Sequence, residues 1–287
     1  MHVEGCCQAL LIRILHVADK KRTGVCIDVG VGTFAFFCEL FARLGFQAVA
    51  VEPLPVNTLR RLCHRYGITL VESCLSDIDG VQTLHIGTFH GAENLNLCSL
   101  VPHWWGVSTK TQQVQSTTMS TLLSTINAET VTCLKLDVEG MESTIIRQFL
   151  AVPESLLPSV VMFEYGGGDN REGGRAGWSQ EFLAGTIECL DVLKKCGYGF
   201  SIGIDSAPDT VERIFDLQSC NLTPDQFFHP HAIYGNIISL RGFVYPETEV
   251  KRICTAYRDN DSPAPALKLP YNHLRGLLDR FRRALKR

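Results

Sequence analysis

The sequence predicts an α/β fold: a mostly parallel, doubly wound sheet with helices on both faces and an antiparallel hairpin at one edge. Apolar, β-branched runs alternate with segments of helical period, about 25 residues per unit, which implies parallel strands joined by right-handed crossovers. The run that begins at Val25 ends in Gly30 and Gly32 and leads directly into a helical pattern. Two late apolar runs, 198–204 and 233–240, predict the antiparallel hairpin.

Composition is that of a globular protein. The 287 residues can bury a large core, and 45% are hydrophobic and 20% charged. A net charge of −3 gives no electrostatic case for nucleic-acid binding. No apolar run approaches the ~20 residues of a membrane span, and no secretory signal is expected. The twelve cysteines include no C-x-x-C pair, which favours free thiols in a reducing, cytoplasmic environment.

The first half of the chain alternates regularly between helices and strands. A helix over 6–20 has apolar residues at spacings of three and four, so we expect it to pack on the sheet. The helix after the first strand presents one apolar face, made by Phe34, Phe37, Phe41 and Leu44. Strands over 48–51 and 69–72 flank a third helix.

The middle of the chain interrupts this alternation. Asp79–Gly80 predicts a hairpin turn into a strand over 81–86. The polar stretch that follows, residues 87–110, is predicted to be a loop excursion over the sheet. Its Trp104–Trp105 pair would either pack on the core or form a substrate platform. A short strand that runs into a helix is predicted over 116–126.

Strands over 131–137 and 160–164 follow, with a helix that opens at Gly140 between them. Residues 166–177 contain six glycines and predict an irregular loop, and a long helix comes after it. Residues 246–287 are predicted to be a C-terminal extension with a basic amphipathic helix. That helix would either pack on the domain or make weak contact with a membrane or a partner.

The glycine turn after the first strand fits two nucleotide-like cofactors. Gly30, Gly32 and Ala35 have the spacing of dinucleotide-binding proteins. A carboxylate at Asp28, however, would repel a pyrophosphate and would pair with a cationic ammonium group. Glu52 ends the next strand, where it can accept hydrogen bonds from both ribose hydroxyls. This pattern favours S-adenosylmethionine, with NAD as the alternative.

A second dense stretch of ionisable residues covers 134–142. On a strand, Lys135, Asp137 and Glu139 would share one face. A buried lysine is costly unless it is paired, and the two acids are its predicted partners. These groups would lie at the ligand-binding edge of the sheet, which favours a catalytic role. The alternative is an ion-pair network that only braces the turn from strand to helix.

Five segments, in their order and intervals, resemble the FkbM-type methyltransferases: CIDVGVGTFAFF, AVEPLPVN, LSDIDG, TTMSTLL and CLKLDVEGMESTII. The resemblance covers about residues 24–165, and KLDVEGME is its most specific part. It implies a Rossmann-like class I methyltransferase domain, expected over residues 1–245. It also implies S-adenosyl-L-methionine as methyl donor and O-methylation of a small molecule, natural product or glycan. Val31, before Gly32, departs from the family, whose members often have Ala-Asn there.

The resemblance also implies roles by position. The cofactor would be held by Asp28, Val29, Gly30, Gly32, Glu52, Ser76, Asp77 and Asp137. Among these, Glu52 would bind the ribose, and Ser76–Asp77 would lie near the adenine. The reaction centre would be lined by Lys135, Asp137, Glu139 and Glu142.

Transfer of a methyl group to a hydroxyl needs near-attack geometry and benefits from a general base. The candidates for this base are Asp137, Glu139 and His103, of which Asp137 has the favoured position. Lys135 would stabilise a developing alkoxide or only neutralise the acids. Asp137, Glu139 and Glu142 could together hold a divalent metal. Because an ion pair with Lys135 accounts for the same residues, no metal site is predicted.

The leading hypothesis is therefore an S-adenosylmethionine-dependent O-methyltransferase with a small-molecule or glycan acceptor. An NAD-dependent oxidoreductase and a non-catalytic binding module with the same fold are the alternatives.

Overall fold

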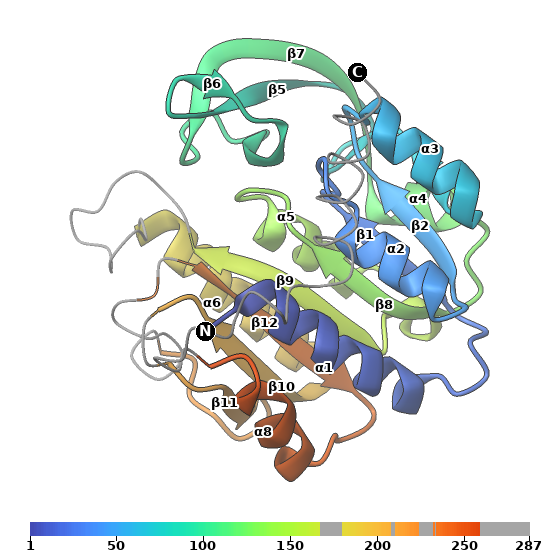
Figure 1. Cartoon of the computed structure of the whole chain (residues 1–287), viewed down its shortest axis with the longest axis vertical. Coiled ribbons are helices and arrows are strands. Elements are labelled where there is room, and N and C mark those ends of the chain that lie inside the picture. Colours follow the sequence, from blue (N-terminus) through green and yellow to red (C-terminus); the bar gives the residue numbers. More distant parts are fainter. Residues whose placement is uncertain (167–179, 208–209, 224–231, 233, 259–287) are drawn as a thin grey trace, which may run out of the picture.

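The computed structural model describes residues 1–166, 180–207, 210–223, 232 and 234–258 (Figure 1). Its centre is an eight-stranded sheet with the order β11-β10-β12-β9-β8-β1-β2-β3. From β9 to β3 in this order the neighbouring strands are parallel, whereas β12, β10 and β11 pair antiparallel. The fold is a mixed α/β structure with a large, mostly parallel sheet, as the alternation of patterns predicts.

The strands of this sheet are β1 Val25–Val29, β2 Gln47–Val51, β3 Thr69–Val71, β8 Val131–Leu136, β9 Val160–Gly166, β10 Tyr198–Asp205, β11 Arg213–Asp216 and β12 Tyr234–Arg241. All five residues of β1 are buried. Because side chains alternate along a strand, Val25, Ile27 and Val29 pack in one hydrophobic core and Cys26 packs in the other. A strand covered on both faces reads as an unbroken apolar run, which is the pattern that predicts it.

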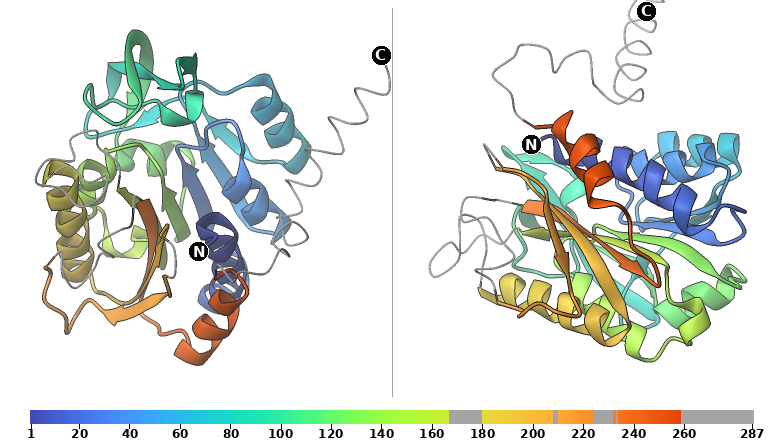
Figure 2. Two further views of the ribbon diagram at one scale, coloured as in Figure 1. Left: turned by 60° about the vertical axis from the view of Figure 1, so that its left-hand side comes forward. Right: turned by 90° about the horizontal axis from the view of Figure 1, so that it is seen from below.

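Helices cover both faces of the sheet (Figure 2). One face carries α1 Val3–Ala18, α2 Phe36–Arg43, α3 Asn57–Tyr66 and α8 Glu247–Thr255. The other carries α4 Met119–Thr125, α5 Glu142–Arg147 and α6 Gln180–Lys195. None of the helices in the described ranges is both long and apolar enough to cross a membrane.

The N-terminal helix packs on the sheet as predicted, although α1 begins at Val3 and ends at Ala18 rather than covering 6–20. Helix α8 lies in the predicted extension, yet its residues Val250 and Ile253 belong to the same core as α1. The ordered core therefore continues past residue 245. The predicted basic helix and nearly all of the glycine-rich loop lie outside the described residues.

The prediction of a loop excursion over 87–110 is wrong at both ends, which lie in strands, whereas residues 94–106 do lie outside the strands. Strands β5 Gly80–Phe89 and β7 Val107–Thr117 pair antiparallel and form a second sheet with the short strands β4 Cys74–Leu75 and β6 Ala92–Glu93 (Figure 1). Residues 109–113 of β7 are exposed, and Val114 is its one buried apolar side chain. Without alternation of apolar and polar residues, no periodicity marks this strand.

The predicted edge hairpin is right in its pairing and wrong in its position. Strands β10 and β12 do pair antiparallel. However, β12 lies next to β9, and β11 takes the sheet edge beyond β10. With four residues, β11 is too short to give a clear pattern, so the sequence does not reveal it.

The hydroxyl of Tyr198 joins β10 to the loop before β9, and its removal tests how much this contact stabilises the fold. It is buried and donates a hydrogen bond to the carbonyl of Pro158 at 2.6 Å. Tyr198→Phe leaves this buried carbonyl without a partner, so we expect the free energy of unfolding to fall by about 1–2 kcal/mol in urea titrations. The matched control is Tyr245→Phe, because Tyr245 is buried and has no hydroxyl hydrogen bond within the described residues. Equal stability of the two variants would contradict the prediction.

Candidate functional site

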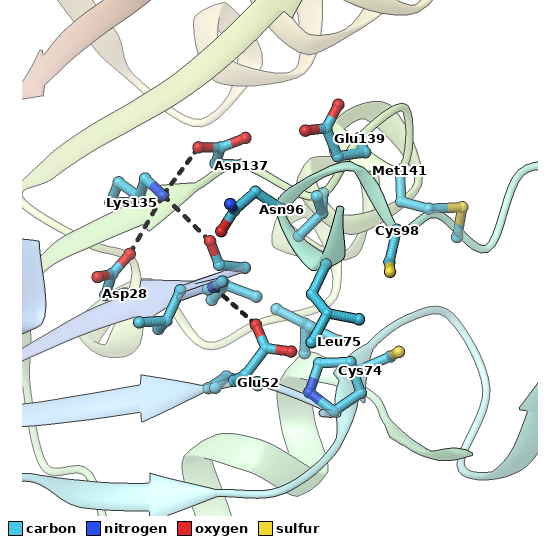
Figure 3. A pocket seen from close by; sticks show the side chains of 18 of the residues that line it. Asp28, Glu52, Cys74, Leu75, Asn96, Cys98, Lys135, Asp137, Glu139 and Met141 are labelled. Atoms are coloured by element: carbon cyan, nitrogen blue, oxygen red, sulfur yellow. Dashed lines mark hydrogen bonds and ion pairs between the residues drawn. The ribbon is translucent and has the colours of Figure 1, made fainter. Parts of the chain in front are cut away.

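A cavity of about 260 Å³ opens at the carboxyl ends of β1, β2 and β8 (Figure 3). Its walls come from the ends of β1, β2 and β8 with the turns that follow them, from residues 73–75, from Leu84 and the segment 95–100, and from Glu4 of α1. The parallel strands end together at this edge, so polar groups distant in sequence converge there. Asp28, Glu52, Lys135 and Asp137 all line this one cavity, as predicted from their positions after or within the strands.

The glycine turn cannot hold larger side chains. Gly30 and Gly32 have φ angles of +72° and +58°. A Cβ atom on Gly30 would lie 1.7 Å from the backbone oxygen of Asp137, and one on Gly32 would lie 2.4 Å from Oδ1 of Asn96. The turn therefore needs glycine for its backbone conformation and for the close approach of Gly30 to Asp137 and of Gly32 to Asn96.

Helix α2 begins later than predicted. The turn continues to Ala35, and the helix starts at Phe36. The placement of Phe34 on the apolar helix face with Phe37 is consequently wrong, because Phe34 is 56% exposed. It lies in the turn and lines the mouth of the cavity instead.

Glu52 holds the glycine turn from the neighbouring strand. Its Oε2 accepts a hydrogen bond from the amide of Gly32 at 2.8 Å, and its Oε1 accepts one from the amide of Leu54 at 2.9 Å. Burial raises the pKa of Glu52, and these two amides oppose the rise. Each carboxylate oxygen keeps a lone pair for a ligand hydroxyl.

Lys135 forms two ion pairs, and only one of the partners, Asp137, is a predicted one. It lies opposite Asp28 in the register of β8 with β1. Its Nζ is 3.3 Å from Oδ1 of Asp28 and 3.2 Å from Oδ2 of Asp137 (Figure 3). Burial alone would lower the pKa of Lys135, yet Asp137 and Asp28 raise it, so the ammonium stays charged.

Asp28 is enclosed by protein groups. Its side chain is almost fully buried, and Oδ2 accepts a hydrogen bond from the amide of Cys38 at 2.9 Å. Burial raises the pKa of Asp28 against the opposing charge of Lys135. Asp137, with a 30% exposed side chain, is the more open acid of the pair.

Glu139 does not share a face with Lys135, and that prediction is wrong. Strand β8 ends at Leu136, and Glu139 lies in the following turn with a φ of +54°. Its carboxylate accepts a hydrogen bond from the indole Nε1 of Trp104, and it lines the cavity. Burial and the nearby charges of Asp137 and Glu142 raise its pKa well above the usual range.

Of the tryptophan pair, Trp104 packs inward, whereas Trp105 is 38% exposed beside Phe89. Trp104 is 7% exposed, contacts the ring of Phe182 edge-on at 4.4 Å and does not line the cavity. Gly140, with a φ of +101°, passes so close that a Cβ atom would lie 2.7 Å from the indole. Trp104 therefore fixes the second sheet to the turn after β8.

Glu142 braces that same turn. Its two oxygens accept hydrogen bonds from the amides of Val138 at 2.9 Å and Gly140 at 3.0 Å, and it does not line the cavity. Burial raises its pKa to about 7. Within the described ranges, no group of three or more His, Cys, Asp or Glu residues has a geometry that could hold a metal ion.

Three other predicted residues lie away from the cavity. Ser76 is buried and bonds to Asp77 and Gln82, and neither Ser76 nor Asp77 lines the cavity. His103 is exposed and faces Glu181, with Nε2 at 2.7 Å from Oε2, so the structure does not bring it to the reacting groups.

Three lining residues have no signal in the sequence. Ser73, just before the predicted Ser76–Asp77, lines the cavity, is 7% exposed and has a hydroxyl without a hydrogen-bond partner in the described part of the chain. Asn96 lies in a short 3-10 helix, Leu95–Leu97, between β6 and β7, and its Oδ1 accepts hydrogen bonds from the amide and hydroxyl of Thr33 at 2.7 and 3.0 Å. Glu4 enters from α1. These three residues reach the cavity through tertiary contacts, which no local sequence pattern reveals.

Residues 23–200 match the family model of the methyltransferase FkbM domain. This region contains the glycine turn, Glu52 and the turn after β8. The chain belongs to the FkbM methyltransferase family. The match supports a methyltransferase enzyme, and it reaches past the resemblance over 24–165 to include α6. No curated protein and no solved structure gives a significant match to the chain.

The ionisation of Glu4 makes a testable contribution to stability. Burial, then the charge of Asp137, raises its pKa from 4.5 to about 7. A raised pKa in the folded state stabilises the protein fully below pH 4.5, and this stabilisation is lost as the pH rises through 7. Glutamine does not ionise, so Glu4→Gln should raise the Tm by about 2–4 °C at pH 8 and by much less at pH 5.

Thermal unfolding of both proteins at the two pH values measures this effect. Glu247→Gln is the control, since Glu247 is exposed on α8. A gain in Tm for Glu4→Gln that is equal at pH 5 and pH 8 would show that the charge of Glu4 is not its cause.

Proposed function

We propose that this family member is an S-adenosylmethionine-dependent O-methyltransferase that acts on a hydroxyl group of a small molecule, natural product or glycan. The observation that carries the proposal is the coincidence of the matched FkbM domain with the cavity. The domain contains the glycine turn, the acid at the end of β2 and the Lys135–Asp137 pair, which line one space. We also propose that the fold is the Rossmann-like fold of class I methyltransferases.

The residues present fit such a cofactor. Val29, Gly30 and Gly32 line the cavity and would present their backbone to its methionine end. Glu52, at the end of β2, would accept from the ribose hydroxyls. The unpartnered, buried hydroxyl of Ser73 supports a polar contact near the base, in place of the predicted Ser76–Asp77.

The proposed chemistry is an in-line displacement. S-adenosylmethionine, when bound, supplies an activated methyl group whose bond to sulfur breaks as its bond to the acceptor oxygen forms. Asp137 is the proposed acceptor of the hydroxyl proton, because it is the acid beside Lys135 with the more exposed side chain. Lys135 holds Asp137 and Asp28 in place with its charged ammonium.

Binding of S-adenosylhomocysteine to a Glu52 variant tests the cofactor. We expect calorimetric titration to show saturable binding to the wild-type protein and none of NADH. Glu52→Gln can offer only one acceptor oxygen to Gly32, Leu54 and a ribose, so its affinity should fall about tenfold or more.

The control is Glu72→Gln, because Glu72 follows β3 and pairs with Arg60 outside the cavity. Binding of NADH in place of S-adenosylhomocysteine would replace the proposal with the oxidoreductase alternative. Binding of neither ligand would favour the non-catalytic module.

Asp137→Asn separates proton transfer from cofactor binding. The amide keeps the shape of the carboxylate but cannot take up a proton, so methyl transfer should fall by about 10²–10⁴-fold. Transfer of labelled methyl groups into a metabolite extract measures the rate, and calorimetry checks that S-adenosylhomocysteine still binds. Unchanged transfer by the variant would exclude Asp137 as the base.

A further inference from the structure

Helix α1 adds an acid to the cavity from outside the matched family domain. The match begins at residue 23, whereas α1 covers Val3–Ala18. Glu4, in the first turn of this helix, lines the cavity. Within the described residues its carboxylate has no hydrogen bond, so it is available to a ligand. Since α1 packs against the sheet through a fully buried apolar face, Glu4 is held in position rather than free to turn away.

The strand order divides the cavity into two sides. Gly32, Glu52 and Ser73 lie on the side of β1, β2 and β3. After burial, the strongest influences on Glu4 are Asp137 and Lys135, of β8 and its following turn, with Asp28 of β1 weaker, and the charge of Glu4 also reaches Tyr234 on β12. The first side carries the residues that fit the cofactor. The second side, around Asp137, is left for the acceptor.

Carboxyl groups gather on the acceptor side. Glu4, Asp137 and Glu139 line it, and Glu164 of β9 shares a hydrogen bond with Asp137. Burial and neighbouring charges raise the pKa of Glu139 and of Glu164 well above the usual range, so these two groups add little negative charge near pH 7. Cys7 and Tyr234, which lie near Glu4 and Glu164, add no positive charge. Among the described residues that line the cavity, Lys135 is the one cation.

Lys135 cannot serve as a binding site for an anion. Its side chain is 5% exposed, and its ammonium already contacts Asp28 at 3.3 Å and Asp137 at 3.2 Å. A carboxylate or phosphate on the acceptor would face the remaining acids without a compensating charge, and such like-charge contacts reject a ligand. A cationic group would instead find open carboxylate oxygens.

We propose that the acceptor carries a positively charged amino group next to the hydroxyl that is methylated, as in an amino sugar or amino alcohol, and that Glu4 binds this group. The inference rests on the proposed function, whose acceptor class it names. Glu4 is a specificity residue supplied by α1, and the amino group orients the neighbouring hydroxyl toward Asp137. Neutral acceptors of the same shape bind less tightly, and acidic ones are rejected.

Three monosaccharides of matched size and different charge test the proposal: glucosamine, glucose and glucuronic acid. Their binding to the protein is measured by ligand-observed NMR at low ionic strength and pH 7.5, with and without saturating S-adenosylhomocysteine. For the wild-type protein we expect glucosamine to bind about tenfold or more tightly than glucose, and glucuronic acid to bind least.

Glu4→Gln should reduce the preference for glucosamine to less than about threefold, since it removes the charge that faces the amino group. Glu247→Gln on α8, which also carries one acid fewer, should keep the full preference. The proposal is overturned if glucuronic acid binds as tightly as glucosamine, if no sugar binds, or if Glu4→Gln leaves the preference intact.

The two proposals fail in different ways. Loss of S-adenosylhomocysteine binding with an intact preference for glucosamine would overturn the methyltransferase function and keep the cationic site. Normal S-adenosylhomocysteine binding without that preference would overturn the role of Glu4 alone.

Discussion

The buried ammonium of Lys135 is the interaction on which the site depends. It lies within β8, opposite Asp28 of β1, and reaches Asp137 just after its own strand. An unpaired charge at this depth would be strongly destabilising, so the three groups require one another. The ion pair between Lys135 and Asp28 also joins the ends of β8 and β1, close to the point where Gly30 packs against the backbone of Asp137. A buried ion pair of this kind contributes more to geometry than to stability.

Around this pair, three other parts of the chain complete the cavity by specific contacts. Glu52 anchors the glycine turn from the end of β2, and Asn96 anchors it from the segment between β6 and β7. Trp104 bonds to Glu139 and fills the space over Gly140. The second sheet is thus attached to both turns that form the cavity floor. This arrangement gives a rigid enclosure built on strand ends, which suits the alignment of two reacting groups.

The parts of the site that local pattern could reveal are those that follow buried parallel strands. Gly30, Gly32 and Glu52 lie where the strand ends place them, and Lys135 is paired because a lysine in a fully buried strand has to be. Local pattern does not place residues in turns. Strand β8 ends three residues before Glu139, so the partner of Glu139 is an indole and not the lysine. Ser76 comes three residues after Ser73, the serine that lines the cavity.

The sequence by itself determined the α/β class, the central parallel strands and the family, because unbroken apolar runs and glycine turns are local features with a local physical cause. Only the tertiary structure decided that β5, β6 and β7 join in a second sheet, that β11 forms the edge, and that His103 faces Glu181 instead of the cavity. It also decided that Glu4 and Asp137 line the same cavity. Contacts between residues far apart in the chain arise when separate helices and strands pack, and no periodicity within either segment encodes them.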